Sequence, residues 1–172
     1  MRLEEILNDK SIKKLDARAR IIDGILQNII TIEDVESAAR ELKDSKVASV
    51  LEALEEISNK GLAELSQEYL EFAKKYILSE DNSCKREASR IVGNLASRYP
   101  QTVRDCIPAL LENTKADGTV IRWSSAYALS RIVVLDEYRS TDLVETLVSV
   151  CGNEQESGVK NQYLKAIKKL KK

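Results

Sequence analysis

The sequence predicts an all-α protein, a solenoid of about four two-helix repeats. Four segments align with one another at a nearly constant spacing, each has the apolar period of an α-helix, and no segment alternates with the period of a β-strand. The composition agrees, because 43% of the residues are hydrophobic and 32% are charged, with only two prolines and six glycines. Such proportions are typical of solvated helices around an apolar seam.

The aligned segments cover residues 46–58, 84–96, 121–133 and 159–171. With the first residue of each segment counted as position zero, positions eight and eleven are aliphatic throughout and step by 38, 37 and 38 residues: Leu54, Val92, Leu129 and Ile167, then Ile57, Leu95, Ile132 and Leu170. Positions zero, four, five, eight and eleven share one side of a helix, so we expect that side to be buried against neighbouring helices.

Another helix is expected before each aligned segment. Apolar residues recur at three- and four-residue spacing over residues 32–43, 64–78, 103–113 and 142–151. Each aligned segment is itself preceded by a turn sequence, at residues 44–45, 81–83, 117–119 and 156–158. These turns are expected to supply N-caps and an acidic first turn, so that each period reads helix, turn, helix.

The two ends of the chain depart from the repeat. A short helix over residues 2–7 and a longer one over 12–29 do not keep the period and are expected to form an amino-terminal cap. The last helix is strongly basic through Lys165, Lys168, Lys169, Lys171 and Lys172. We therefore expect a single domain over residues 1–172, with a cap at 1–30 and repeats at 31–60, 61–98, 99–136 and 137–172.

The third repeat resembles a HEAT repeat. The resemblance rests on Ile107-Pro108-Ala109-Leu110-Leu111, then Asp117, then Ile121-Arg122 and Ala126-Tyr127-Ala128-Leu129-Ser130. The preceding repeat matches through Asp81, Lys85, Ala88, Val92 and Gly93, and the outer two match more loosely. The resemblance covers roughly residues 32–172 and implies a right-handed α-α superhelix with about four HEAT-like helix pairs, whose second helices line a concave face.

HEAT repeats typically carry a polar ladder between neighbouring repeats, made by an aspartate in the turn and a basic residue after it. The resemblance gives this role to Asp81 with Lys85 and to Asp117 with Arg122. The first repeat departs from the pattern, because Val47 stands where the basic residue is expected.

Several chemistries have no support in the sequence, and we expect no catalytic residues, no cofactor and no metal site. There is no histidine, and the phosphate-loop patterns GxGxxG and GxxxxGK[ST] and the nucleophile elbow GxSxG are absent. The carboxylates Glu52, Glu55 and Glu56 have the spacing of a solvated helix face. The three cysteines are far apart and are expected to be buried thiols: Cys84, Cys106 and Cys151.

No secretory signal and no run long enough to span a membrane is visible, so a cytoplasmic protein with no membrane partner is the simplest interpretation. Lys plus Arg number 27 and Asp plus Glu 28, giving a net charge of −1. This balance gives no global electrostatic reason to expect binding to nucleic acid.

Positions two, six, nine and ten of the aligned segments are expected to point outward into the concave groove. They are, in order, Ala48, Glu52, Glu55, Glu56; Arg86, Arg90, Gly93, Asn94; Trp123, Tyr127, Ser130, Arg131; and Asn161, Lys165, Lys168, Lys169. Trp, Tyr and Arg dominate binding hot spots, so a candidate partner-binding set emerges: Arg86, Arg90, Trp123, Tyr127, Arg131 and Lys165. Alternatively, Trp123 packs between repeats beneath an arginine, in a cation–π contact that serves only stability.

The sequence favours a non-catalytic scaffold or adaptor that holds a protein or peptide, best one with an anionic segment. The alternative is nucleic-acid recognition, resembling the HEAT-like alkylpurine DNA glycosylases, which use a basic groove with aromatic residues and a catalytic aspartate. Here the residue one turn after Trp123 is Tyr127, not a carboxylate, which speaks against that catalysis. Two further alternatives rest on the repeat alone: a resemblance to HEAT-like lyases that handle bilins, and self-association through the solenoid ends.

Overall fold

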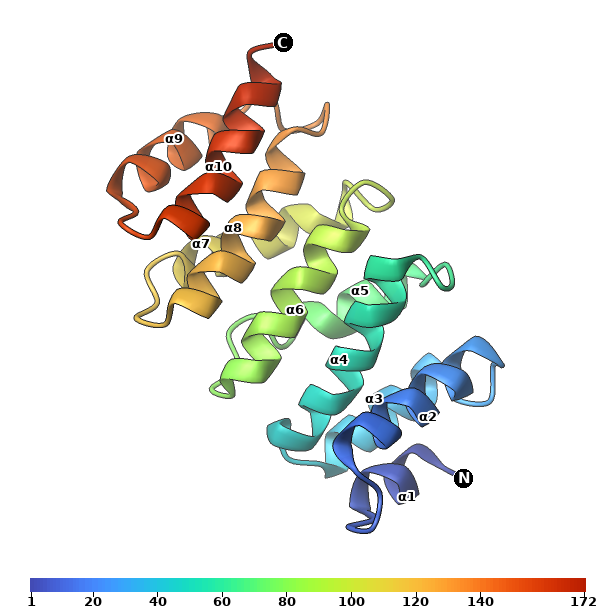
Figure 1. Ribbon diagram of the computed structural model, residues 1–172. Helices are drawn as coiled ribbons and strands as arrows, with labels where there is room; N and C mark the ends of the chain where they lie inside the picture. The colour runs from blue at the N-terminus through green and yellow to red at the C-terminus, as the bar shows by residue number, and fades with distance from the viewer.

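The computed structural model describes residues 1–172 and contains ten α-helices, one 3-10 helix and no strand, which confirms the all-α prediction (Figure 1). The elements are α1 (Leu3–Asn8), α2 (Lys14–Leu26), α3 (Ile32–Glu41), α4 (Asp44–Lys60), α5 (Gln67–Lys74), α6 (Asn82–Leu95), η1 (Thr102–Cys106), α7 (Ile107–Asn113), α8 (Thr119–Val133), α9 (Leu143–Asn153) and α10 (Ser157–Leu170). None of them combines the length and the apolar character needed to cross a membrane.

The even-numbered helices form one row along the molecule. Contacts join α2 to α4, α4 to α6, α6 to α8 and α8 to α10, and Figure 1 shows these helices side by side from the amino-terminal to the carboxyl-terminal end. The helices α3, α5, α7 and α9 each pack against the even-numbered helix that follows them, and α3 also contacts α5. The four aligned segments are therefore α4, α6, α8 and α10, which follow one another in chain order along the row.

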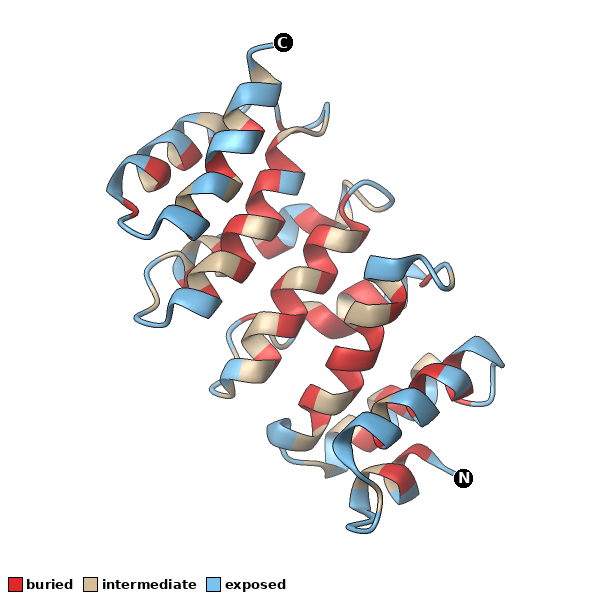
Figure 2. Ribbon diagram, viewed as in Figure 1, coloured by how far each residue is buried: buried red, intermediate tan, exposed pale blue.

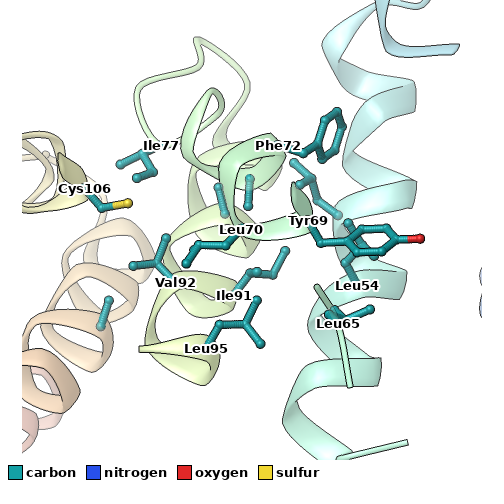
Figure 3. Close-up of a cluster of buried hydrophobic side chains, with 14 of the residues drawn as sticks. Leu54, Leu65, Tyr69, Leu70, Phe72, Ile77, Ile91, Val92, Leu95 and Cys106 are labelled. Carbon is teal, nitrogen blue, oxygen red and sulfur yellow. The ribbon is translucent and has the colours of Figure 1, made fainter. Parts of the chain in front are cut away.

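One continuous core runs between the two sets of helices. It contains 43 buried apolar residues, and Figure 2 shows them concentrated along α4, α6 and α8. In the middle of the chain, Tyr69 and Phe72 of α5 lie toward α4, whereas Leu70 lies beside Ile91 of α6 (Figure 3). Burying a side chain of this size contributes about 1.5–3 kcal/mol, so packing between successive helix pairs holds the row together.

The aliphatic positions that define the repeat are buried through the first three aligned helices. Positions eight and eleven are fully or almost fully enclosed in α4, α6 and α8, whereas Ile167 and Leu170 of α10 are half-buried. Position five of α10 was expected to be buried, but Leu164 is 47% exposed. The reason is that α10 ends the row and has a neighbouring even-numbered helix on one side only.

The helix predicted over residues 12–29 is shorter in the structure. It ends at Leu26, because Asn28 adopts a left-handed conformation with φ of 56°. The carbonyl oxygen of Gly24 then accepts bonds from the N–H groups of Ile29 and Ile30 at 2.8 and 3.0 Å. This turn closes the helix and returns the chain toward α3.

Only one of the four turn sequences supplies the expected side-chain N-cap. The carboxylate of Asp81 accepts from the N–H of Cys84 at 2.9 Å, whereas α8 and α10 begin without a side-chain cap at Gly118 and Glu156. Asp44 lies inside the first turn of α4, and its carboxylate accepts from the hydroxyl of Ser79 at 2.6 Å instead. That bond joins two successive helix pairs.

The polar ladder does not use the predicted partners. Neither Asp81 and Lys85 nor Asp117 and Arg122 form an ion pair between side chains. The carboxylate of Asp81 instead caps its own helix α6. The guanidinium of Arg122 contacts Glu154 of the next helix pair, with Nε and Oε2 3.1 Å apart. Arg122 pairs with Glu154 and not with the side chain of Asp117, because Glu154 is almost fully buried and would otherwise lack a counter-charge.

Candidate functional site

Four of the residues that were predicted to face outward are buried. They are Ala48, Glu52, Gly93 and Ser130. The prediction treated each helix as having one buried side, but α4, α6 and α8 contact an even-numbered helix on both flanks as well as the helix beneath them. The exposed arc of each helix is correspondingly narrow, and it retains mainly the long side chains.

A stack of aromatic and cationic side chains lies on this arc between α6 and α8. The rings of Trp123 and Tyr127 are stacked, with centroids 5.4 Å apart and planes 22° from parallel. The guanidinium of Arg90 lies 5.1 Å from the centroid of Trp123, and that of Arg131 lies 4.2 Å from the centroid of Tyr127. Each aromatic ring therefore contacts the other ring and one cation, a favourable arrangement for cation–π attraction.

The stack is fixed to α6 through the phenol of Tyr127. Its hydroxyl donates to Oδ1 of Asn94, and Nδ2 of Asn94 donates to the hydroxyl of Ser58 on α4 at 3.0 Å. Burial raises the pKa of Tyr127, more than offsetting the neighbouring cation Arg131, so the hydroxyl stays protonated as a donor. The aromatic position predicted as a binding anchor is thus held rigidly by a bond network that spans three helices.

Gly93 makes this close approach of Tyr127 possible. A Cβ atom at position 93 would lie 2.9 Å from two carbons of the Tyr127 ring and 3.0 Å from Cα of Ala128. The alignment of the four repeated segments placed Gly93 in the groove, whereas the structure places it beneath the ring of Tyr127. A glycine inside the last turn of a predicted helix was the one signal that could have revealed this packing, because glycine within a helix is costly without such a reason.

A pocket of about 410 Å³ opens beside the stack, between α6, α8 and α10. We call it the basic pocket, because Arg131, Lys165 and Lys169 line it together with Tyr127, and none of its twelve lining residues is Asp or Glu. None of these three cations, nor Arg90 nearby, has a carboxylate oxygen within 4.0 Å. The structure therefore brings Tyr127, Arg131 and Lys165 of the predicted set to one place, with Trp123 and Arg90 beside them.

Arg86 belongs to a different environment. Its Nε lies 2.8 Å from the carboxylate of Glu87, and its Nη2 lies 3.8 Å from that of Glu52, which Lys14 also approaches at 2.8 Å. Both carboxylates are almost fully buried. Arg86 thus neutralises buried charge between α4 and α6, and it is not a free cation on the surface.

Five lining residues of the basic pocket were not among the positions predicted to face the groove. Three of them follow the ends of α6 and α8, namely Ser97, Val134 and Leu135. The other two lie on α10, where Gln162 is half-buried and Ala166 is buried. Elsewhere in the molecule, no group of three or more Cys, Asp and Glu side chains is placed to hold a metal ion. Cys84, Cys106 and Cys151 are all buried free thiols, as predicted.

The chain resembles two engineered proteins whose crystal structures were determined by the Northeast Structural Genomics Consortium. It is 17% identical to one at a TM-score of 0.62 and 19% identical to the other at a TM-score of 0.67. Each alignment covers 98% of this chain and 79% of the engineered chain. At such low identity the likeness concerns the fold alone. No protein-family model matches the sequence, and a search of curated proteins found no match.

Proposed function

We propose that the chain is a HEAT-like α-solenoid, a right-handed superhelix whose concave face is formed by α4, α6, α8 and α10. The repeat spacing of 37 or 38 residues and the unbroken order of helix contacts support this proposal. So do the polar links between successive helix pairs, such as Asp44 with Ser79 and Arg122 with Glu154. A stack of similar units that each contact only their neighbours is the defining property of such a fold.

On this fold the protein acts as a non-catalytic scaffold that binds an anionic segment of a protein or peptide. The observation that carries the proposal is the group of cations without acidic partners beside an ordered aromatic stack. Arg90, Arg131, Lys165 and Lys169 lie on one face, although the chain as a whole is slightly acidic. Like charges gathered in this way repel one another, and a bound anion would relieve that repulsion.

Nucleic acid remains the competing ligand, because the same cations could contact phosphates. The opposite end of the face speaks against it. Glu55 and Glu56 of α4 are half-exposed there, and Glu56 is paired with Lys60 at 2.7 Å. A long polyanion that followed the row would therefore leave the unpaired cations and meet the unpaired carboxylate of Glu55. An anionic peptide segment of limited length avoids this repulsion, and we therefore favour a protein partner.

A charge-reversal pair tests the proposal. The variant R131E/K165E removes two pocket cations, and R40E/R104E changes the net charge equally at two exposed arginines outside this face that have no ion pair. We would measure anisotropy of a fluorescein-labelled peptide pool rich in Glu and Asp, and of single- and double-stranded DNA, at low and physiological ionic strength. Losing two charge-assisted contacts should weaken peptide binding by about tenfold or more, because each contributes about 1.5–3 kcal/mol.

The control variant should bind the peptides as the wild type does, and Trp123→Ala should weaken binding without loss of helicity. Equal peptide affinity in R131E/K165E and wild type would refute the proposed face. Salt-sensitive binding to DNA that exceeds the affinity for the acidic peptides would transfer the assignment to nucleic acid.

A further inference from the structure

We infer that the basic pocket takes a phosphoryl group, the dianion of a phosphorylated side chain on the partner segment. This inference rests on the proposed function and narrows its ligand class. The juxtaposition that carries it is three cations from two helices around one pocket that contains no carboxylate.

The charge of the pocket matches a dianion better than a carboxylate. Arg131 comes from α8, and Lys165 and Lys169 lie one turn apart on α10, so their charges converge from two sides. A glutamate or aspartate side chain brings one negative charge and two acceptor oxygens. A phosphorylated side chain carries a charge of about −1.5 to −2 and three strong acceptor oxygens, enough to engage all three cations.

The arginine is also held ready for such a ligand. The guanidinium of Arg131 lies over the ring of Tyr127, which Asn94 fixes in turn, so the arginine loses little freedom when an anion binds. The planar fork of an arginine fits two phosphoryl oxygens at once, whereas lysine acts as a point charge. The pocket therefore combines one oriented fork with two mobile cations.

Neutral groups complete the site. Ser130 lines the pocket and is 9% exposed, with its hydroxyl oxygen buried and without a hydrogen-bond partner, so this residue contributes shape and no charge. Gln162 adds an amide, and Val134 and Leu135 provide an apolar wall for the carbon atoms of the phosphorylated side chain. A volume of about 410 Å³ leaves room for the phosphoryl group and for the side chain that carries it.

The same geometry separates a single phosphoryl group from a nucleic-acid backbone. Phosphodiesters repeat along a strand and need a continuous track of cations. Here the unpaired cations end at α6, and on α4 the face carries the unpaired carboxylate of Glu55 and the ion pairs of Glu56 with Lys60 and Arg18. The extent of positive charge fits a single phosphoryl group, whose charge makes the bound segment anionic.

The test uses the full chain and three fluorescein-labelled peptide pools. The pools share randomised flanks and carry phosphoserine, serine or glutamate at one fixed central position, and a single-stranded DNA of similar length serves as the fourth probe. We expect the phosphoserine pool to bind at least about tenfold more tightly than the other two pools, because the phosphoryl group makes one or more additional charge-assisted hydrogen bonds. R131E/K165E should abolish this preference, and R40E/R104E should retain it.

A titration of isotope-labelled protein with N-acetyl-phosphoserine amide locates the site. The side-chain resonances of Gln162 and of the single tryptophan, Trp123, should shift, and N-acetyl-glutamate amide should shift them less at equal concentration. Equal binding of the glutamate and phosphoserine pools would overturn the phosphoryl inference and leave the proposed function standing. No binding of any pool, acidic peptides included, would overturn both. Tighter binding of the DNA than of the phosphoserine pool would also overturn the inference.

Discussion

Replacing Gly93 by alanine tests whether the aromatic stack depends on close contact between α6 and α8. In the middle of an exposed helix, glycine to alanine stabilises a protein by roughly 0.5–1 kcal/mol. At this position the new Cβ would lie 2.9 Å from the Tyr127 ring and 3.0 Å from Cα of Ala128, both closer than side-chain atoms normally approach. The ring and the backbone of α8 must therefore move together.

The expected cost follows from these contacts. Forcing extra atoms into a packed interface costs about 1–3 kcal/mol. Displacing the Tyr127 ring also disturbs its bond to Asn94, worth about 0.5–1.5 kcal/mol. After the gain in helix propensity is subtracted, G93A should lower the free energy of unfolding by about 1–3 kcal/mol. For a chain of this length that corresponds to a fall in Tm of roughly 2–4 °C per kcal/mol.

The matched control is G152A, because Gly152 also lies within a helix but has no atom within 4 Å of the added Cβ. Both variants would be unfolded in urea and followed by far-ultraviolet circular dichroism, with wild type beside them. G152A should be unchanged or more stable by up to about 1 kcal/mol, so G93A should be the less stable of the two variants. A G93A protein as stable as G152A would refute the close packing of Tyr127 on α6.

Three further results follow from buried ionisable groups. Hydrogen bonds from backbone N–H groups and from Arg122 outweigh burial and lower the pKa of Glu154. The stability that this carboxylate contributes is therefore present above its usual pKa of 4.5 and is lost as the pH falls through the lowered pKa. E154Q should be less stable than wild type in urea at pH 7, and the difference should vanish in acid. Burial raises the pKa of Glu87 despite its partner Arg86, so ionising this carboxyl costs stability as the pH rises. The free energy of unfolding of E87Q at pH 7 should equal or exceed that of wild type, and a clearly lower value would contradict this reasoning. Burial raises the pKa of Cys84 and Cys106 to about 12 and also raises that of Cys151, so a thiol reagent at pH 8 should leave all three unmodified until denaturant is added.

The helices and most of their buried faces could be predicted from the sequence. The 38, 37 and 38 residue steps of Leu54 and its equivalents locate α4, α6, α8 and α10, because a helix must place such residues on one side whatever its partners are. The end of α2 could not be predicted in this way. It depends on the left-handed conformation of Asn28, which competes with continued helix by a small free energy.

The residue types of the candidate site could be predicted from the sequence, but which cations belong to the site could not. Trp123, Tyr127 and the arginines near them were selected because the spacing places them on one arc. Arg86 lies one turn before Arg90 on the same side of α6, yet it neutralises buried carboxylates on α4 and α6. Spacing along one helix carries no information about the charge of the neighbouring helix, and that charge decides whether a cation is free.

The sequence by itself determined that this protein is helical and which repeat positions are apolar, because both depend on interactions within a few turns of one helix. Only the tertiary structure decided which outward positions are covered, where Arg122 finds its counter-charge, and which cations share a pocket. Each of these depends on the distance between residues more than 30 positions apart, as between Arg122 and Glu154. Such distances are set by how closely helices approach, and at α6 and α8 a single glycine permits that approach.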